Sequence, residues 1–151
     1  MSSYEIAKRC IGIVEIPGAK DHPMITWAYL VAGAPWLSDD KDAWCGASRA
    51  LWGFLAGEAI PAMPARARSW LNWGAPVPLT EPQIGDTVIL MRGEGPQPGP
   101  EVIKAPGHVC YWAGGGPENF IGFGGNQHNS VSTATFETKR ILGIRRNLIA
   151  P

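Results

Sequence analysis

Cys45 has the residue type and the local setting of a catalytic nucleophile. Residues 43–57 show the apolar spacing of an amphipathic helix, and Cys45 lies in its first turn. Backbone N–H groups at a helix start are unpaired and favour an anion such as a thiolate. The same groups can stabilise the oxyanion of a tetrahedral intermediate. Cysteine is also one of the most buried residue types, so an inert core thiol is the competing interpretation.

A base for this thiol is available at His108, which begins a predicted strand after a long Pro/Gly-rich loop at residues 92–106. Nucleophilic catalysis by cysteine needs a histidine within hydrogen-bond reach and a third group that holds the other ring nitrogen. Asn126 and Gln127 close the next predicted strand, and antiparallel pairing brings that end beside His108. Either amide could orient the imidazole, because a shift of one residue in register exchanges the two side chains.

Other polar residues near Cys45 have simpler explanations. Asp40 and Asp42 precede the predicted helix, where the helix dipole favours acidic residues without any catalytic role. A zinc site made of Cys45, His108 and Cys110 lacks the close ligand spacing of known sites and an obvious fourth ligand. We therefore expect no metal and no cofactor.

The elements that must position these residues come in two groups. We expect helices at 4–13, 23–32, 43–57 and 64–73, and strands at 84–91, 109–112, 120–123, 130–134 and 141–145. Helices followed by short strands predict an α+β fold with an antiparallel sheet of about five to six strands. The helical part covers about residues 1–80 and the sheet part about 81–148. Along the second strand, His108, Cys110 and Trp112 should project from one face and Val109 and Tyr111 from the other.

Aromatic residues are candidates for substrate contacts. Trp44, Trp73 and Trp112 could line a groove, since aromatic faces give a large contact area at low entropy cost. Trp70 and Trp73 are three residues apart on a predicted helix, so they share a face, and such a face is normally buried in a small domain. Groove and core therefore both remain open for the tryptophans.

The composition limits the class of protein. The 151 residues suit a single domain, 1–151. The 13 Lys and Arg balance the 13 Asp and Glu, which excludes a nucleic-acid binder that acts through a basic surface. We see no signal peptide and no apolar run of membrane-spanning length. Three cysteines without CxxC spacing suggest no disulfide framework, and with the missing signal they favour synthesis in the bacterial cytoplasm. We also expect a monomer.

Several motifs occur in a recognisable order: DAWCGA, ARARSWLNWGAPV, the Gly85–Asp86 pair, GHVCYW, FGGNQHNSVS and KRILGIRR. Together they resemble the phage-type branch of the NlpC/P60 and CHAP peptidoglycan hydrolases, over nearly the whole chain. The resemblance implies a papain-like fold, with Cys45 as nucleophile, His108 as general base and the third polar position at Asn126 or Gln127, of which we prefer Asn126. The family often has WCAAF where this chain has WCGAS, which leaves the packing of the helix behind Cys45 to be explained.

The resemblance also implies a reaction. The Cys45 thiolate would attack an amide of the peptidoglycan stem peptide, as an endopeptidase or an N-acetylmuramoyl-L-alanine amidase. The Cys45 N–H, helped by a donor from residues 39–43, would hold the oxyanion. A phage endolysin or tail-associated lysin would reach the bacterial wall through a holin or the virion. The alternatives are a secreted antibacterial amidase toxin with an immunity protein as partner, and a non-catalytic wall-binding or virion module of the same fold.

Overall fold

In the computed structural model, which describes residues 1–18, 20–38 and 41–148, three α-helices precede the strands along the chain. The helices are α1 (Ser3–Lys8), α2 (Pro23–Val31) and α3 (Cys45–Leu55), with 3-10 helices η1 (Ala67–Asn72) and η2 (Thr138–Arg140). The strands are β1 (Ala75–Val77), β2 (Thr87–Met91), β3 (Gly107–Gly115), β4 (Asn119–Gln127), β5 (Ser130–Glu137) and β6 (Ile141–Arg146). The α+β class predicted from the sequence is therefore confirmed.

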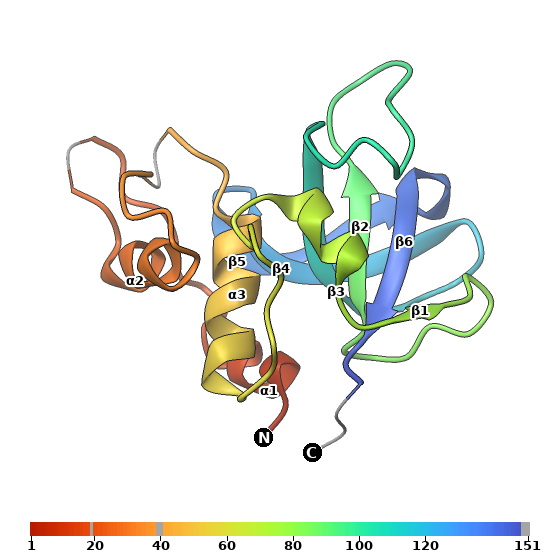
Figure 1. Cartoon of the computed structure of the whole chain (residues 1–151), viewed down its shortest axis with the longest axis horizontal. Coiled ribbons are helices and arrows are strands. Elements are labelled where there is room, and N and C mark those ends of the chain that lie inside the picture. The colour runs from red at the N-terminus through yellow and green to blue at the C-terminus, as the bar shows by residue number, and fades with distance from the viewer. Residues whose placement is uncertain (19, 39–40, 149–151) are drawn as a thin grey trace.

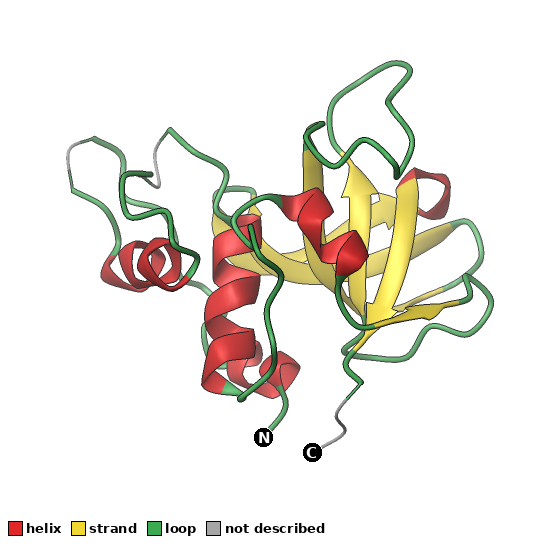
Figure 2. Ribbon diagram, viewed as in Figure 1, coloured by secondary structure: helices red, strands yellow, loops and turns green. Residues whose placement is uncertain are grey.

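The strands form one antiparallel sheet in the order β1-β6-β2-β3-β4-β5. Figure 1 shows the α-helices gathered beside the sheet, with α3 between α2 and the strands. The helices and strands form two distinct layers in Figure 2, and η1 lies against the strands. This arrangement places α3 directly against the part of the sheet that carries His108.

The sheet has two packed faces, and β3 contributes to both. Val109 and Tyr111 pack into the cluster that includes the helices, whereas Cys110 and Trp112 pack into a smaller cluster on the opposite face with Phe120. The predicted alternation along this strand is confirmed. Burial on both faces explains why β3 has few polar side chains.

Several element boundaries differ from the sequence prediction. Ser2 caps α1 through a capping box, but the helix ends at Lys8 rather than near residue 13, and Gly12 follows with a φ of 86°. The predicted helix at 64–73 is the shorter 3-10 helix η1. Strands β3 and β4 extend through glycines that the prediction treated as breaks. Gly115 is one of these, and a Cβ there would overlap the Phe120 backbone, so only glycine fits.

The tryptophans predicted to line a groove are core residues. Trp44 is 0% exposed, and Trp73 and Trp112 are each 7% exposed. The indole N–H groups of Trp44 and Trp73 donate hydrogen bonds within the protein, and the Trp112 ring stacks on Phe120 with 4.8 Å between centroids. Because a groove residue must present its ring to solvent, the expected substrate contacts are corrected for all three. The shared buried face of Trp70 and Trp73 is confirmed.

Arg49 fastens α3 to the sheet. Its side chain is buried, its Nε donates to the Thr87 Oγ1 at 3.0 Å and its Nη2 pairs with the Glu58 carboxylate at 2.8 Å. The guanidinium also lies over the rings of three aromatic residues, Trp70, Trp73 and Tyr111. These contacts fix the helix that begins with Cys45 relative to β2.

Arg68 holds the Pro/Gly-rich loop that leads to His108. The Arg68 guanidinium is fully buried, and it donates from Nε to the Pro106 carbonyl at 2.9 Å and from Nη1 to the Pro98 and Gly99 carbonyls at 3.0 and 2.7 Å. At the start of the loop, the Arg140 Nη2 donates to the Met91 and Gly93 carbonyls. The loop is therefore tied to the core at both ends.

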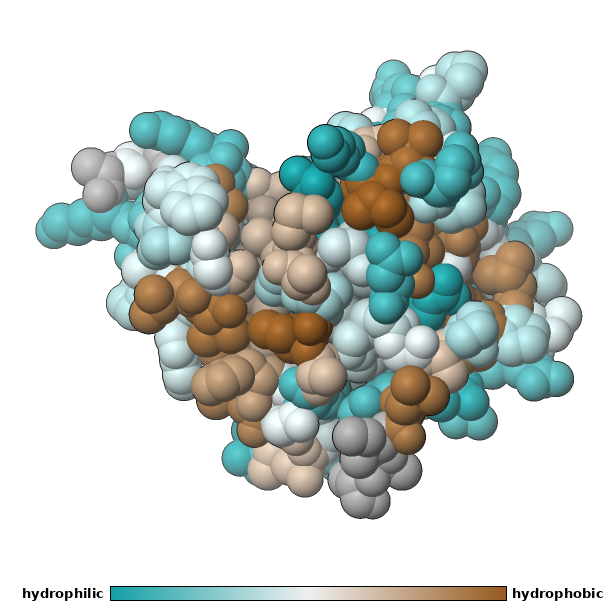
Figure 3. Space-filling model, in the orientation of Figure 1, coloured by the Kyte–Doolittle hydropathy of each residue, from teal (hydrophilic) through white to brown (hydrophobic). Residues whose placement is uncertain are grey.

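The space-filling view shows where the surface is hollowed. In Figure 3 the upper outline dips between the part of the molecule that holds α2 and the part that holds the 92–106 loop. Both α3 and β3 begin at this edge (Figure 1). Among the described residues, no helix has the length and apolar character needed to cross a bilayer.

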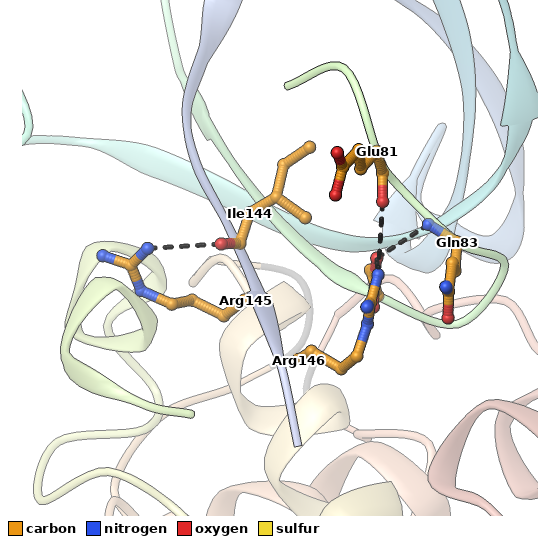
Figure 4. Close-up of polar contacts among 6 residues, drawn as sticks. Glu81, Gln83, Ile144, Arg145 and Arg146 are labelled. Carbon is orange, nitrogen blue, oxygen red and sulfur yellow. Dashed lines mark hydrogen bonds and ion pairs between the residues drawn. The ribbon is translucent and has the colours of Figure 1, made fainter. Parts of the chain in front are cut away.

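At the opposite edge, Arg146 ties the end of β6 to the segment before β2. Its guanidinium makes two 2.7 Å bonds to the Asp86 carboxylate and a 3.3 Å bond to the Glu81 carbonyl, and the Asp86 carboxylate also accepts the Gln83 N–H (Figure 4). A cavity of about 330 Å³ lies here, lined by residues from both ends of the described chain.

Candidate active site

Cys45 is the first residue of α3, as predicted, and its side chain is 2% exposed. Trp44 precedes it as the N-cap residue and provides no side-chain hydrogen bond to the helix. The first-turn N–H groups of α3 are therefore not satisfied by a capping side chain. These N–H groups are therefore free to donate hydrogen bonds to an oxyanion formed by attack of the Cys45 Sγ.

The departures from the family motif around Cys45 have a packing explanation. A Cβ on Gly46 would lie 2.5 Å from the carbonyl oxygens of Pro64 and Ala65, so this position accommodates only glycine. Ser48 packs where Gly125 of β4 approaches the helix, and its hydroxyl donates back to α3 carbonyls. Small residues at these positions let α3 sit close to the 64–65 segment and to β4.

His108 lies beside Gln127, and Gln127 is itself fixed in orientation. The His108 Nε2 and the Gln127 Oε1 are 3.1 Å apart. The Gln127 Nε2 donates to the Gly122 and Ser132 carbonyls at 3.0 and 2.6 Å. Since both amide hydrogens are used, the oxygen must face His108, and the ring must donate from Nε2. This leaves the His108 Nδ1 to exchange a proton with Cys45.

Asn126 does not occupy the position preferred for it. The pairing of Trp112 with Gly122, continued in steps of two residues, would place residue 126 opposite His108. However, the β4–β5 register shifts between Gly124 and Gln127 by one extra residue, and Asn126 adopts a φ of 57°. This β-bulge brings Gln127 to His108, while Asn126 lies in the bulge and borders the same cavity. Of the two amides left open by the sequence, the structure brings Gln127 to His108.

The hairpin after the bulge supports this geometry. His128 and Asn129 form a two-residue turn, with φ values of 51° and 58°, between the paired residues Gln127 and Ser130. The Ser130 and Ser132 hydroxyls each donate to the Gln127 carbonyl at 2.9 Å. Asn and His tolerate a positive φ better than most residues, so the string NQHN carried a signal for this turn.

The electrostatics of the site favour a thiolate. Burial by itself raises the pKa of Cys45, but the charge of His108, a hydrogen bond with it and the Val109 N–H together lower this pKa to about 7. Burial likewise opposes the charged form of His108, yet its interactions with Cys45 and Gln127 raise the His108 pKa above the usual value. Each group therefore stabilises the charged form of the other.

The remaining acids and thiols near the site have other roles. The Asp42 carboxylate accepts the Ser38 N–H at 3.1 Å, which stabilises the loop before α3. Asp39 and Asp40, which belong to the region expected to help the oxyanion, lie outside the described residues. Burial, reinforced by the charge of Cys45, strongly raises the pKa of Cys110, so this residue stays a neutral thiol. Within the described ranges, no cluster of three His, Cys, Asp or Glu side chains is placed to hold a metal.

Two cavities lie near the site, one at His108 and one next to the segment that packs on the start of α3. One, of about 250 Å³, contains His108 and Gln127 and is bordered by Arg92, His128 and Phe136. The other, of about 490 Å³, lies between the loop after α2 and residues 62–66, and includes Ala65, whose carbonyl contacts the first turn of α3. Its border includes Trp36, which is 77% exposed. The tryptophans predicted from the sequence to bind substrate are buried, whereas Trp36 and Arg92, which border these cavities, were not predicted.

No family model matches this chain, and no curated protein matches it. The functional conclusion therefore depends on the geometry of the site and on the motifs noted in the sequence.

Proposed function

We propose that this protein is a cysteine hydrolase of papain-like fold that cleaves an amide bond in the peptide stem of peptidoglycan. The observation that carries the proposal is the array of Cys45, His108 and Gln127, three side chains from α3, β3 and β4 that meet at the hollowed edge. The nucleophile is at a helix start, the base is buried beside it, and an amide held by two backbone carbonyls orients the base.

The array supports a two-step mechanism. The Cys45 thiolate attacks the amide carbonyl, the first-turn N–H groups of α3 stabilise the oxyanion, and the His108 imidazolium gives its Nδ1 proton to the leaving amine. Water then loses a proton to His108 and attacks the thioester, which releases the carboxylic acid and restores the thiolate. Throughout, the Gln127 oxygen accepts the Nε2–H and keeps the ring in one tautomer.

The substrate class follows from the resemblance of the motifs to the NlpC/P60 and CHAP hydrolases. The cavity that contains His108 and Gln127 supports it, because it gives a substrate side chain a place beside the proposed base. We propose a lysin delivered by a holin or a virion, acting as an endopeptidase or as an N-acetylmuramoyl-L-alanine amidase on the bacterial wall.

Digestion of purified sacculi tests this function. The wild-type protein should release new amino groups and soluble muropeptides, and mass spectrometry of these products identifies the bond that is cut. Cys45→Ala should remove the activity, because it removes the thiol that interacts with His108. Cys10→Ala is the matched control, since Cys10 is a half-buried thiol in the turn after α1. Binding of sacculi without release of amino groups, or full activity of Cys45→Ala, would contradict the proposal.

A further inference from the structure

The cavity of about 250 Å³ that His108 and Gln127 line carries a positive charge without an ion-pair partner. Its lining includes the exposed Arg92 at the end of β2. Within residues 1–18, 20–38 and 41–148, the ion pairs join other residues, namely Arg49 with Glu58, Lys139 with Glu137 and Arg146 with Asp86. The Arg92 guanidinium is therefore available to an anion that enters from solvent.

The charge of Arg92 acts on the reactive pair itself. It lowers the pKa of the Cys45 thiol and also that of the His108 imidazole, although it is the smallest of the causes acting on each group. Both effects require that the guanidinium lies within electrostatic range of the reacting atoms. Arg92 and His108 line the same cavity, so an anion bound to Arg92 would share that cavity with the proposed base.

The rest of the cavity suits a short acidic side chain. Phe136 and Ala134 provide an apolar surface for methylene groups, while Asn126, His128 and Thr135 place polar groups around it. A cavity of about 250 Å³ has room for a side chain of a few heavy atoms. A single guanidinium matches the planar geometry of a carboxylate, which it can bind through two parallel hydrogen bonds.

We infer that this cavity is a carboxylate-recognition subsite, in which Arg92 binds a free carboxylate of the substrate beside the amide that Cys45 attacks. The inference rests on the proposed function and narrows it. The preferred substrate is a stem peptide with an acidic residue next to the cleaved bond, and amidation of that carboxylate weakens binding. Arg92 is a specificity residue and takes no proton in the reaction.

Two alkylating reagents test the subsite without any peptidoglycan. Iodoacetate and iodoacetamide both modify the Cys45 thiolate, but only iodoacetate carries a carboxylate. The ratio of their rates cancels any change in the pKa of Cys45, since both reagents react with the same thiolate. Arg92→Gln should lower the iodoacetate to iodoacetamide ratio about fivefold, the upper end of what one solvent-exposed ion pair contributes. Arg9→Gln, which removes an exposed charge at the end of α1, should leave the ratio as in the wild type.

The results distinguish a failure of the proposed subsite from a failure of the proposed function. An unchanged ratio in Arg92→Gln, with Cys45 still alkylated by both reagents, would overturn the subsite and leave the proposed function intact. Failure of either reagent to modify Cys45 in the native wild type would overturn both. With paired stem peptides that carry either the free carboxylate or its amide, wild-type kcat/KM should favour the acid, and Arg92→Gln should bring the two values close together. Equal preference in the wild type would contradict the subsite.

Discussion

Cys45, His108 and Gln127 depend on one another more than on their separate positions. Both groups of the Cys45–His108 pair are buried, and burial opposes their charged forms, yet mutual attraction lowers one pKa and raises the other. The sequence predicted Cys45 and His108 from their places at a helix start and a strand start. It left the third residue between Asn126 and Gln127, because strand alternation alone does not show where an extra residue interrupts the ladder.

The pH dependence of alkylation at Cys45 follows from its lowered pKa. Only the thiolate reacts, so the rate with iodoacetamide should rise with pH and reach half its maximum near pH 7. In urea-unfolded protein the midpoint should move to the ordinary thiol value of about 8.5. His108→Ala removes the main interaction that opposes burial, so its midpoint should lie above that of the wild type. Mass spectrometry of the Cys45 peptide measures the rates, and identical midpoints for the two proteins would contradict the pairing.

Substitution at positions 126 and 127 separates the two amides. Gln127→Ala should lower kcat by up to about 100-fold with a smaller change in KM, because the imidazole loses the acceptor that orients it. Asn126→Gly is the matched control, since glycine adopts the positive φ of the bulge without strain. It should keep most of the activity in a muropeptide-release assay. The reverse pattern would assign the orienting role to Asn126.

At the scale of the elements, close contact between α3 and its neighbours decides where the thiol lies. The sequence showed the amphipathic pattern of this helix and its start, and both are found. It did not show why Gly46 replaces a larger residue, because the reason is a contact with the distant Pro64 and Ala65 carbonyls. Gly115 of β3 and Gly125 of β4 likewise lie beyond the predicted strand ends, although close contacts at both positions leave no room for a side chain.

Gly46→Ala tests this contact. The added methyl group would overlap two backbone carbonyls, which cannot move as a flexible side chain does. We expect a loss of about 1–3 kcal/mol in the free energy of unfolding by urea, and a slower alkylation of Cys45 in the fraction that stays folded. Gly116→Ala is the control, because a Cβ there meets no atom within 4 Å. Equal stability of the two variants would show that the 64–65 segment moves aside freely.

At the scale of the whole molecule, buried arginines connect segments that are far apart in the chain. Arg49 joins α3 to β2, and Arg68 joins η1 to the 92–106 loop. The sequence predicted the loop from its Pro and Gly content, and long loops of this kind are often mobile. The hydrogen bonds by which Arg68 holds this loop, here called the Arg68 clamp, could not be predicted from the sequence. They depend on carbonyl groups that come close to Arg68 only in the folded protein.

Arg68→Ala should release the loop. Four hydrogen bonds from a charged donor are lost, and bonds of this kind contribute about 1.5–3 kcal/mol each without being additive, so we expect a loss of several kcal/mol in stability. Hydrogen exchange and limited proteolysis within residues 92–106 should increase before the rest of the protein unfolds. Arg66→Ala, which changes a half-buried arginine two residues earlier, should not affect the loop. Unchanged protection of the loop in Arg68→Ala would contradict the clamp.

The bulge at Asn126 has a consequence for how related chains should be aligned. The amide that faces His108 is selected by its pairing with Ser130, and not by its distance along the chain from Gly124. A homologue that lacks the bulge residue would restore strict alternation and present the same amide two positions after the glycine. An alignment of the two chains without a gap would then pair residues that have different roles in the active site. Deletion of Asn126 should accordingly preserve the site better than deletion of Gly125, which lies against Trp44 and Ser48.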